Sequence, residues 1–278
     1  MSDWWIYSAV LVAAMSHASW NYIVKASSDR ILTTAGMRFF GLIIALVLLF
    51  FVPWPGISAL PYLLGQVSFA CVYYFFLLNS YRVGEFSSVY PIARGLAPVS
   101  VLLAASLFHV ESLVGGELAA TVVISCGIFL FATTLSNNLT AFGYAVATGL
   151  MIGAYTFLAG LGVRQSNSIV GYLAWTEVLI GLVIVPVCWS LRRGQVRAHF
   201  RAYWPTLVFT AILSAGAFGI VLWAFKNLPL GPVTAVRETS VAFAVLLGVF
   251  LLKERLGLTK IIALILVFIG IMVLAFFR

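Results

Sequence analysis

One segment of the sequence occurs twice, and each copy places an arginine inside an apolar stretch long enough to cross a membrane. The copies are residues 87–111 and 230–254, and at a constant offset of 143 positions Arg94 aligns with Arg237. A charge deep in a bilayer costs at least ~2.5 kcal/mol on insertion scales, so it usually faces a protein interior or a wet cavity. Two such charges at matched positions predict a duplicated membrane protein with a polar site at its centre.

The composition supports a chain that lies almost entirely in a membrane. Of its 278 residues, 63% are hydrophobic and 9% are charged, whereas a soluble domain carries about 25% charged residues. We therefore expect an all-α integral membrane protein without a soluble domain. The first residues lack a signal-peptide pattern, so the first span is expected to be retained. The net charge of +8 is interpreted as topology control and contact with lipid headgroups, not as nucleic-acid binding.

Ten stretches are long enough to span a bilayer, which takes roughly 20 apolar residues. The last two spans match the fourth and fifth, so we divide the chain into five-span halves, residues 1–137 and 138–278. An odd number of spans per half turns the second half upside down, which is the inverted repeat typical of secondary transporters. The predicted spans are residues 4–24, 31–52, 60–81, 87–109, 113–135, 141–163, 169–191, 203–225, 231–252 and 256–277.

Two matched motifs carry a resemblance to a known family. Residues 253–256, Lys-Glu-Arg-Leu, precede an apolar stretch with Gly270-Ile271, and residues 109–113 with Gly127-Ile128 hold the same places in the first half. The chain resembles the EamA-like members of the drug/metabolite transporter superfamily over nearly its whole length. The resemblance implies a secondary transporter of small metabolites, proton-coupled or facilitated and commonly outward. It also implies a central cavity lined by the predicted spans 4–24, 60–81, 87–109, 141–163, 203–225 and 231–252.

Loop charges give an orientation that differs from the usual one for such relatives. The positive-inside rule places the face with more Lys and Arg in the cytoplasm. Both termini are expected on the opposite face, outside the cytoplasm. Ten basic residues collect on that face: Lys25, Arg30, Arg82, Arg192, Arg193, Arg197, Arg201, Lys253, Arg255 and Lys260. Three collect on the other: Arg164, Lys226 and Arg278.

Arg94 and Arg237 are the leading substrate-binding residues. Arg94 lies between Pro91 and Pro98, and we expect these prolines to bend or open the helix and expose its backbone to a ligand. The alternative for Arg94 is a helix–helix ion pair with Glu177 or Glu238. At ~1.5 Å per residue the two arginines are expected about 10 Å apart along the membrane normal, too far to hold one carboxylate together.

Three titratable residues are proton-coupling candidates. Glu238 directly follows Arg237, and adjacent helical side chains point about 100° apart, so we expect the two to face different directions. Glu238 is interpreted as a proton carrier or, equally, as a permanently ionised partner of an arginine. Glu177 is more readily a bracing ion-pair residue, because its span is peripheral in relatives. His17 is the third candidate.

A polar face on the first span completes the predicted site. His17, Trp20 and Asn21 are three and four positions apart, so they share one helix face. That face offers a stacking surface, an amide and an imidazole, or else serves helix packing. Lys25, near the span end, is expected to snorkel to the headgroups. Tyr90 lies one turn before Arg94 and is a weaker candidate for the cavity lining.

These residues predict a transporter in a bacterial cytoplasmic membrane that works by alternating access. Two buried arginines favour a small anionic or zwitterionic substrate, such as an amino acid or a phosphonate, because guanidinium pairs such groups bidentately. Proton-coupled export of cationic or aromatic compounds is the alternative, and a lipid scramblase a more distant one. The three cysteines lack metal or disulfide spacing, and no motif indicates an enzyme, a metal or a cofactor.

Overall fold

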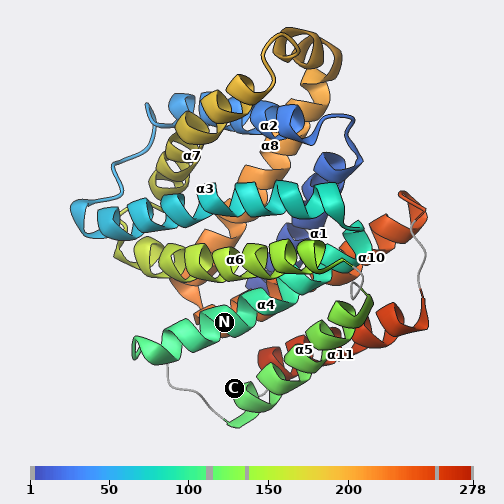
Figure 1. Ribbon diagram of the computed structural model, residues 1–278. Coiled ribbons are helices and arrows are strands. Elements are labelled where there is room, and N and C mark those ends of the chain that lie inside the picture. Colours follow the sequence, from blue (N-terminus) through green and yellow to red (C-terminus); the bar gives the residue numbers. More distant parts are fainter. Residues whose placement is uncertain (1–3, 111–114, 135–137, 254–256, 277–278) are drawn as a thin grey trace.

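The computed structural model describes the chain except for residues 1–3, 111–114, 135–137, 254–256 and 277–278, and the described part contains helices and no strand (Figure 1). Glu111, Glu254 and Arg255 of the family motifs lie outside the described residues. The helices are α1 Trp4–Ala26, α2 Arg30–Leu48, the short 3₁₀ helix η1 Ile57–Ala59, α3 Leu60–Val83, α4 Phe86–Leu107, α5 Gly115–Thr134, α6 Leu139–Gln165, α7 Ile169–Leu191, α8 Val196–Asn227, α9 Leu230–Arg237, α10 Ser240–Phe250 and α11 Leu258–Phe276.

Within the described residues, each of the ten predicted apolar stretches lies largely on helix, and six segments are long and apolar enough by themselves to cross a membrane. These six are α2, η1 with α3, α4, α6, α7 and α8. The ninth stretch forms two helices, α9 and α10. The structure thus supports a multi-pass membrane protein, while the count of ten spans stays a prediction.

The sequence between the predicted seventh and eighth spans, residues 192–202, is basic and predicts a surface loop, but the connection in the structure is shorter. Residues 196–202 continue α8 toward its N-terminus, and the connection from α7 is a short turn. Gly194 has φ of 89° in this turn, a conformation that glycine adopts without steric cost.

The two halves of the chain pack into each other. Helices α3 and α4 lie against α6, α2 against α7, α1 against α8, and α5 against α11, so the most extensive contacts join residues before 137 to residues after it. Figure 1 shows α3, α6 and α4 in parallel rows, with α5 and α11 along one edge and α2 and α7 along the other. A central site between the rows is therefore built from both halves.

Small residues let α4 approach α6 closely. A Cβ added at Gly153 would lie 2.3 Å from Ser100 Cβ, and one added at Gly149 would lie 2.7 Å from the Ala93 carbonyl oxygen. Close backbone approach through small residues is a common way for helices to associate in membranes, because lipid supplies no hydrophobic driving force between them. This contact fixes the segment of α4 that carries Arg94.

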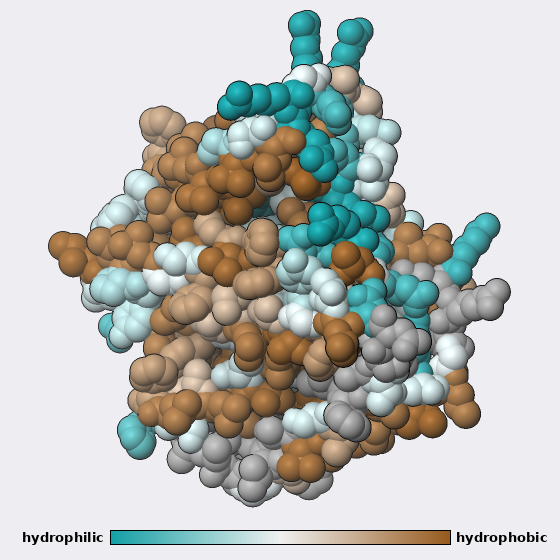
Figure 2. All heavy atoms as spheres, viewed as in Figure 1, coloured by the Kyte–Doolittle hydropathy of each residue, from teal (hydrophilic) through white to brown (hydrophobic). Residues whose placement is uncertain are grey.

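Charged side chains gather on one side of the molecule, which we call the basic face. It is the side where α1, α3 and α7 end, with Lys25, Arg82 and Arg192 near those ends and Arg30 at the start of α2. Figure 2 shows hydrophilic side chains along the upper right of the view and apolar side chains over most of the remaining surface. This distribution matches a body immersed in lipid with polar ends.

Candidate functional site

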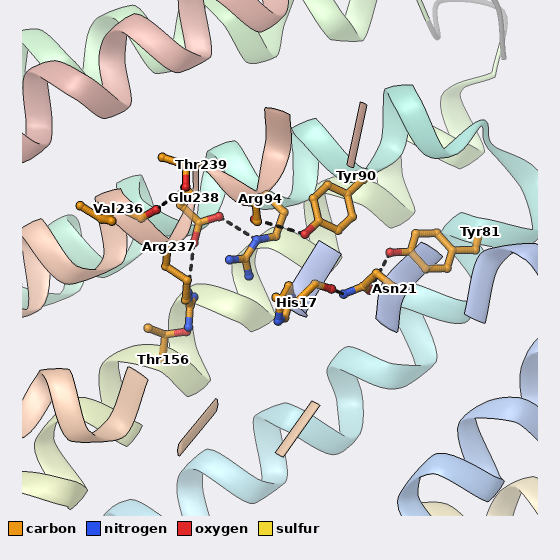
Figure 3. A network of polar contacts seen from close by, with 11 residues as sticks. His17, Asn21, Tyr81, Tyr90, Arg94, Thr156, Val236, Arg237, Glu238 and Thr239 are labelled. Carbon is orange, nitrogen blue, oxygen red and sulfur yellow. Dashed lines mark hydrogen bonds and ion pairs between the residues drawn. The ribbon is translucent and has the colours of Figure 1, made fainter. Parts of the chain in front are cut away.

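Two arginines and one glutamate form a buried ionic centre between α4 and the junction of α9 with α10 (Figure 3). Arg94 Nε lies 2.7 Å from Glu238 Oε2, and Arg237 Nε lies 3.3 Å from Glu238 Oε1. Arg237 Nη2 also donates a hydrogen bond to Thr156 Oγ1 on α6 at 3.1 Å. The three charged residues are at most 3% exposed. Of the two alternatives for Arg94, the ion pair with Glu238 is thus present, and its role toward a substrate stays a prediction.

The expectation that both arginines could not hold one carboxylate is wrong. Glu238 accepts Arg94 on one oxygen and Arg237 on the other. The predicted separation came from the depth of each arginine below the start of a continuous helix. A continuous ninth helix would also point Arg237 and Glu238 about 100° apart. Because α9 ends at Arg237, Glu238 is freed from the helical direction and its side chain can meet its own neighbour and α4 at once.

We predicted a bent or opened helix in the first copy of the repeated segment, but the helix is interrupted in the second copy. Helix α4 is continuous through Pro91 and Pro98, whereas Glu238 and Thr239 separate α9 from α10. Across this break the backbone bonds tighten to an i→i−3 pattern, from Thr239 N to the Val236 oxygen and from Val241 N to the Glu238 oxygen. The Thr239 hydroxyl also donates to the Val236 oxygen at 2.7 Å. Hydroxyl groups that bond the backbone compete with helical geometry, and short 3₁₀ stretches inside helices often mark hinges.

A second buried ion pair involves an arginine that was not among the predicted site residues. Arg38 Nη1 on α2 lies 2.8 Å from Glu177 Oε2 on α7, and Arg38 Nη2 donates to Ser214 Oγ on α8. The Arg38 guanidinium also lies 5.3 Å from the centre of the Tyr74 ring, a cation–π distance. Glu177 is therefore in an ion pair between two helices, the role that the sequence analysis favoured for it. Its partner is Arg38 and not Arg94. Arg38 lies inside the apolar stretch 31–52, so the rule that singled out Arg94 also applied to it.

The ion pairs border a central cavity of about 60 Å³. A buried water needs ~10–15 Å³ by this measure, so the space holds roughly four to six waters and is too small for an amino acid. Helices α2 and α7 contribute to its lining although the family resemblance implied otherwise, and α4 does not reach it. The polar and aromatic lining residues are His17, Trp20, Arg38, Gln66, Tyr73, Tyr74, Tyr155, Thr176, Glu177, Ser214, Phe218 and Arg237.

The predicted polar face of α1 divides between two cavities. His17 and Trp20 border the central cavity, with ring centroids 5.1 Å apart. Asn21 borders a smaller cavity of about 10 Å³, which His17, Tyr90 and Arg94 also line. The Asn21 amide donates to the His17 carbonyl and accepts from the Tyr81 hydroxyl at 2.8 Å, so Asn21 ties α1 to α3.

Several buried polar atoms at these cavities have no hydrogen-bond partner within the described part of the chain. They include His17 Nε2, Trp20 Nε1, and Arg94 Nη1 and Nη2. Tyr90 is satisfied, because its hydroxyl lies 3.2 Å from Ser240 Oγ. Buried polar groups nearly always have partners, so these atoms are suited to bind water or a ligand.

Lys25 caps the C-terminal end of α3, so the prediction that it extends to the lipid headgroups is wrong. Its Nζ donates to the carbonyl oxygens of Tyr81 and Gly84 at 2.9 and 2.5 Å, at the end of α3. In the second half, Arg164 of α6 donates to the carbonyl oxygens of Phe225 and Leu228 at the end of α8. Cations are favourable at helix C-termini, where carbonyl groups lack helical partners.

The comparisons with known proteins agree with this architecture. Residues 139–276 match the sequence profile of the EamA-like transporter family. The chain belongs to the EamA-like transporter family. EamA-like proteins are membrane transporters of small molecules, so this chain is a transporter embedded in a membrane, consistent with the expectation that it is no enzyme.

The fold of nearly the whole chain is similar to that of a solved structure. A solved structure, described only as a protein crystal structure, superposes with a TM-score of 0.67 over 98% of this chain and 96% of the other, at 16% identity. At that identity the likeness concerns the fold alone. No curated protein sequence matches the chain. In the described residues, no group of three His, Cys, Asp or Glu side chains is placed to hold a metal ion.

Proposed function

We propose that this EamA-like protein moves a small anionic or zwitterionic metabolite across a bacterial cytoplasmic membrane. The observation that carries the proposal is an excess of buried positive charge around the central cavities. In the described part of the chain, Arg38, Arg94 and Arg237 lie there against the two carboxylates Glu177 and Glu238. With all five ionised the site carries one net positive charge, and an anionic group on the substrate neutralises it.

The surroundings of the arginines favour a particular class of substrate. Arg94 has two Nη groups free to donate, and carboxylates and phosphonates accept such donors bidentately. Trp20, Tyr73 and Tyr155 border the neighbouring cavity and suit an apolar or aromatic moiety. An amino acid or a phosphonate meets both requirements. Trp20 and the tyrosines also suit an aromatic cation, the alternative substrate.

Alternating access fits the small cavity, because a metabolite enters only if the helices separate. The proposal includes an inverted repeat of residues 1–137 and 138–278. The matched cation caps support it: Lys25 of the first helix holds the end of the third, and Arg164 of the sixth holds the end of the eighth. Repeats of this kind let one half rock against the other around a fixed site.

Glu238 is the preferred proton carrier in this mechanism. Its carboxylate occupies Arg94 and Arg237 as a substrate anion would. Protonation of Glu238 removes that internal anion and leaves both guanidinium groups for the substrate. The proton and the anion then bind together, which predicts co-transport. His17 and Glu177 are weaker carriers. Protonation of Glu177 would free one guanidinium group, that of Arg38, and not two. His17 has no carboxylate among its hydrogen-bond or ring contacts in the described residues.

A thermal-shift screen of the purified protein tests the substrate class. Carboxylates, phosphonates and phosphate esters are expected to raise the melting temperature, since ligands that bind only the folded state stabilise it. Arg237→Lys should weaken the shift, because a point charge does not replace the planar fork, whereas the exposed Arg193→Lys should not. Stabilisation by quaternary amines alone would favour the cation exporter, and passage of labelled lipids between leaflets would favour the scramblase.

Transport in vesicles tests the coupling. Glu238→Gln should remove the pH dependence of uptake, because a neutral side chain then stands at this position at every pH. Glu177→Gln and His17→Gln are the comparisons. An unchanged pH profile in Glu238→Gln assigns the proton to another group.

A further inference from the structure

A larger cavity, of about 560 Å³, lies between α3 and α7 and begins at the basic face. We call it the lateral cavity. Its outer end carries Asp29, Arg30, Arg82 and Arg192, and its inner walls are mainly apolar. The wall residues are Ile31, Cys71, Tyr74, Phe75, Leu78, Ile184, Val187, Cys188 and Leu191, with Asn79 near the outer end.

The lateral cavity is about one lipid leaflet deep. On α3 its lining runs from Arg82 to Cys71, which is roughly 16 Å at ~1.5 Å per residue. The hydrocarbon core of a bilayer is ~30 Å thick. The cavity therefore reaches from the headgroup level to about the bilayer midplane.

The lateral cavity opens toward the lipid. Three of its lining residues, Phe75, Val187 and Leu191, are 58%, 51% and 60% exposed. In a membrane these apolar side chains contact acyl chains. An acyl chain can thus pass from the bilayer into the space between α3 and α7.

The outer end of the lateral cavity is positively charged. Asp29 pairs with Arg192 at 2.7 Å, and among the described residues of the cavity lining no other carboxylate is present to pair with Arg30 or Arg82. Arg82 is exposed, and Arg30 donates from Nε to the Lys25 carbonyl. Basic sites between membrane helices attract anionic headgroups, and the leaflet beside the positive face is the anionic one.

We propose that the lateral cavity binds an anionic phospholipid from the adjoining leaflet. The phosphate lies at Arg30 and Arg82, and one acyl chain lies between α3 and α7. Tyr74 borders both the lateral and the central cavity, so the end of the chain contacts a wall of the central cavity. Lipid binding is independent of which substrate the central cavity takes.

Native mass spectrometry of the purified protein tests the lipid site. With chain-matched lipids, the protein should retain phosphatidylglycerol in preference to phosphatidylcholine. Arg82→Gln and Arg30→Gln should each lower phosphatidylglycerol retention about fivefold, since one basic residue near a membrane surface contributes ~1 kcal/mol. Arg193→Gln is the matched control, because Arg193 is exposed near the same face and lies outside the cavity lining.

A filling variant and a soluble competitor separate the two parts of the ligand. Leu78→Trp should lower retention of both lipids by occupying the space of the acyl chain. Glycerol 3-phosphate should compete poorly, because it lacks the chain. Equal retention of the two lipids, a loss in Arg193→Gln equal to that in Arg82→Gln, or full competition by glycerol 3-phosphate would each overturn the proposal.

Discussion

Arg94 and Arg237 occupy matched positions in the duplicated segment, yet Arg94 lies inside a continuous helix and Arg237 at the end of a short one. The copy with two prolines stays helical, and the copy that contains Arg-Glu-Thr-Ser at residues 237–240 is interrupted there. Proline disturbs a helix by removing one donor, but α4 is packed closely on the glycine face of α6. In the second copy, Glu238 lies between two arginines and a neighbouring hydroxyl bonds the backbone. The difference teaches that buried charge pairing and local hydroxyl groups shaped this site more than proline did.

The strongest test of this asymmetry is the removal of each arginine. Arg94→Ala should destabilise the protein by ~3–5 kcal/mol, because it leaves the buried Glu238 with only the 3.3 Å contact to Arg237. Arg237→Ala should cost less, about 1–3 kcal/mol, because the 2.7 Å contact to Arg94 remains. Denaturation in detergent measures both. The double variant with Glu238→Gln should recover part of each loss, and equal losses in the single variants would contradict the asymmetry.

The packing of α4 on α6 gives the next test. Gly153→Ala should destabilise by about 1–3 kcal/mol, because its Cβ would meet Ser100 Cβ at 2.3 Å. Gly143→Ala in the same helix has nothing within 4 Å of the added atom and should be neutral or slightly stabilising. Melting temperatures of the two variants check this. A Gly143→Ala loss as large as that of Gly153→Ala would mean that close packing is not what fixes α4.

Substrate binding from the two sides of the membrane sharpens the comparison further. Because both arginines contact one carboxylate, we expect them to serve one shared site. Arg94→Lys and Arg237→Lys should each weaken binding about tenfold, the scale of one charged hydrogen bond, and equally from both sides of oriented vesicles. Unequal losses would instead indicate a hand-over of the anion between the arginines.

The smallest expected effect concerns two helix caps, one in each half. Asp29 caps α2 by accepting from the backbone N–H groups of Ile31 and Leu32, and Ser168 caps α7 by accepting from the Gly171 N–H. Partial burial raises the pKa of Asp29, but the Leu32 N–H and Arg192 together outweigh it and hold the pKa below its ordinary value. The contribution of a carboxylate with a lowered pKa is present at neutral pH and is lost as the pH falls through that value.

Asp29→Ala should therefore cost about 1 kcal/mol at neutral pH, and the difference from the unmodified protein should shrink below about pH 4. Ser168→Ala should cost a similar amount with no change in that pH range. Unfolding curves at several pH values measure both. A pH-independent Asp29→Ala effect would mean that the carboxylate charge contributes nothing.

Much of the architecture could be predicted from the sequence, because the cost of burying polar groups in lipid is a local property. Each apolar stretch had to be helical, since a lipid-exposed backbone must satisfy its own hydrogen bonds. The charges inside those stretches had to face inward. Arg94, Arg237, Glu238 and Glu177 were found on that basis, and Arg38 met the same criterion.

Only the tertiary structure decided how the charges pair and where the helix breaks. Glu238 binds two arginines that were expected to lie too far apart, and Glu177 pairs with Arg38 across α2 and α7. Pairing depends on which helices are neighbours and on side-chain reach, and neither is encoded in a single stretch. The break after Arg237 likewise follows from Glu238 meeting α4, a contact between residues 144 positions apart. Energies that act over such separations are set by the packed molecule, so a pattern read along the chain does not contain them.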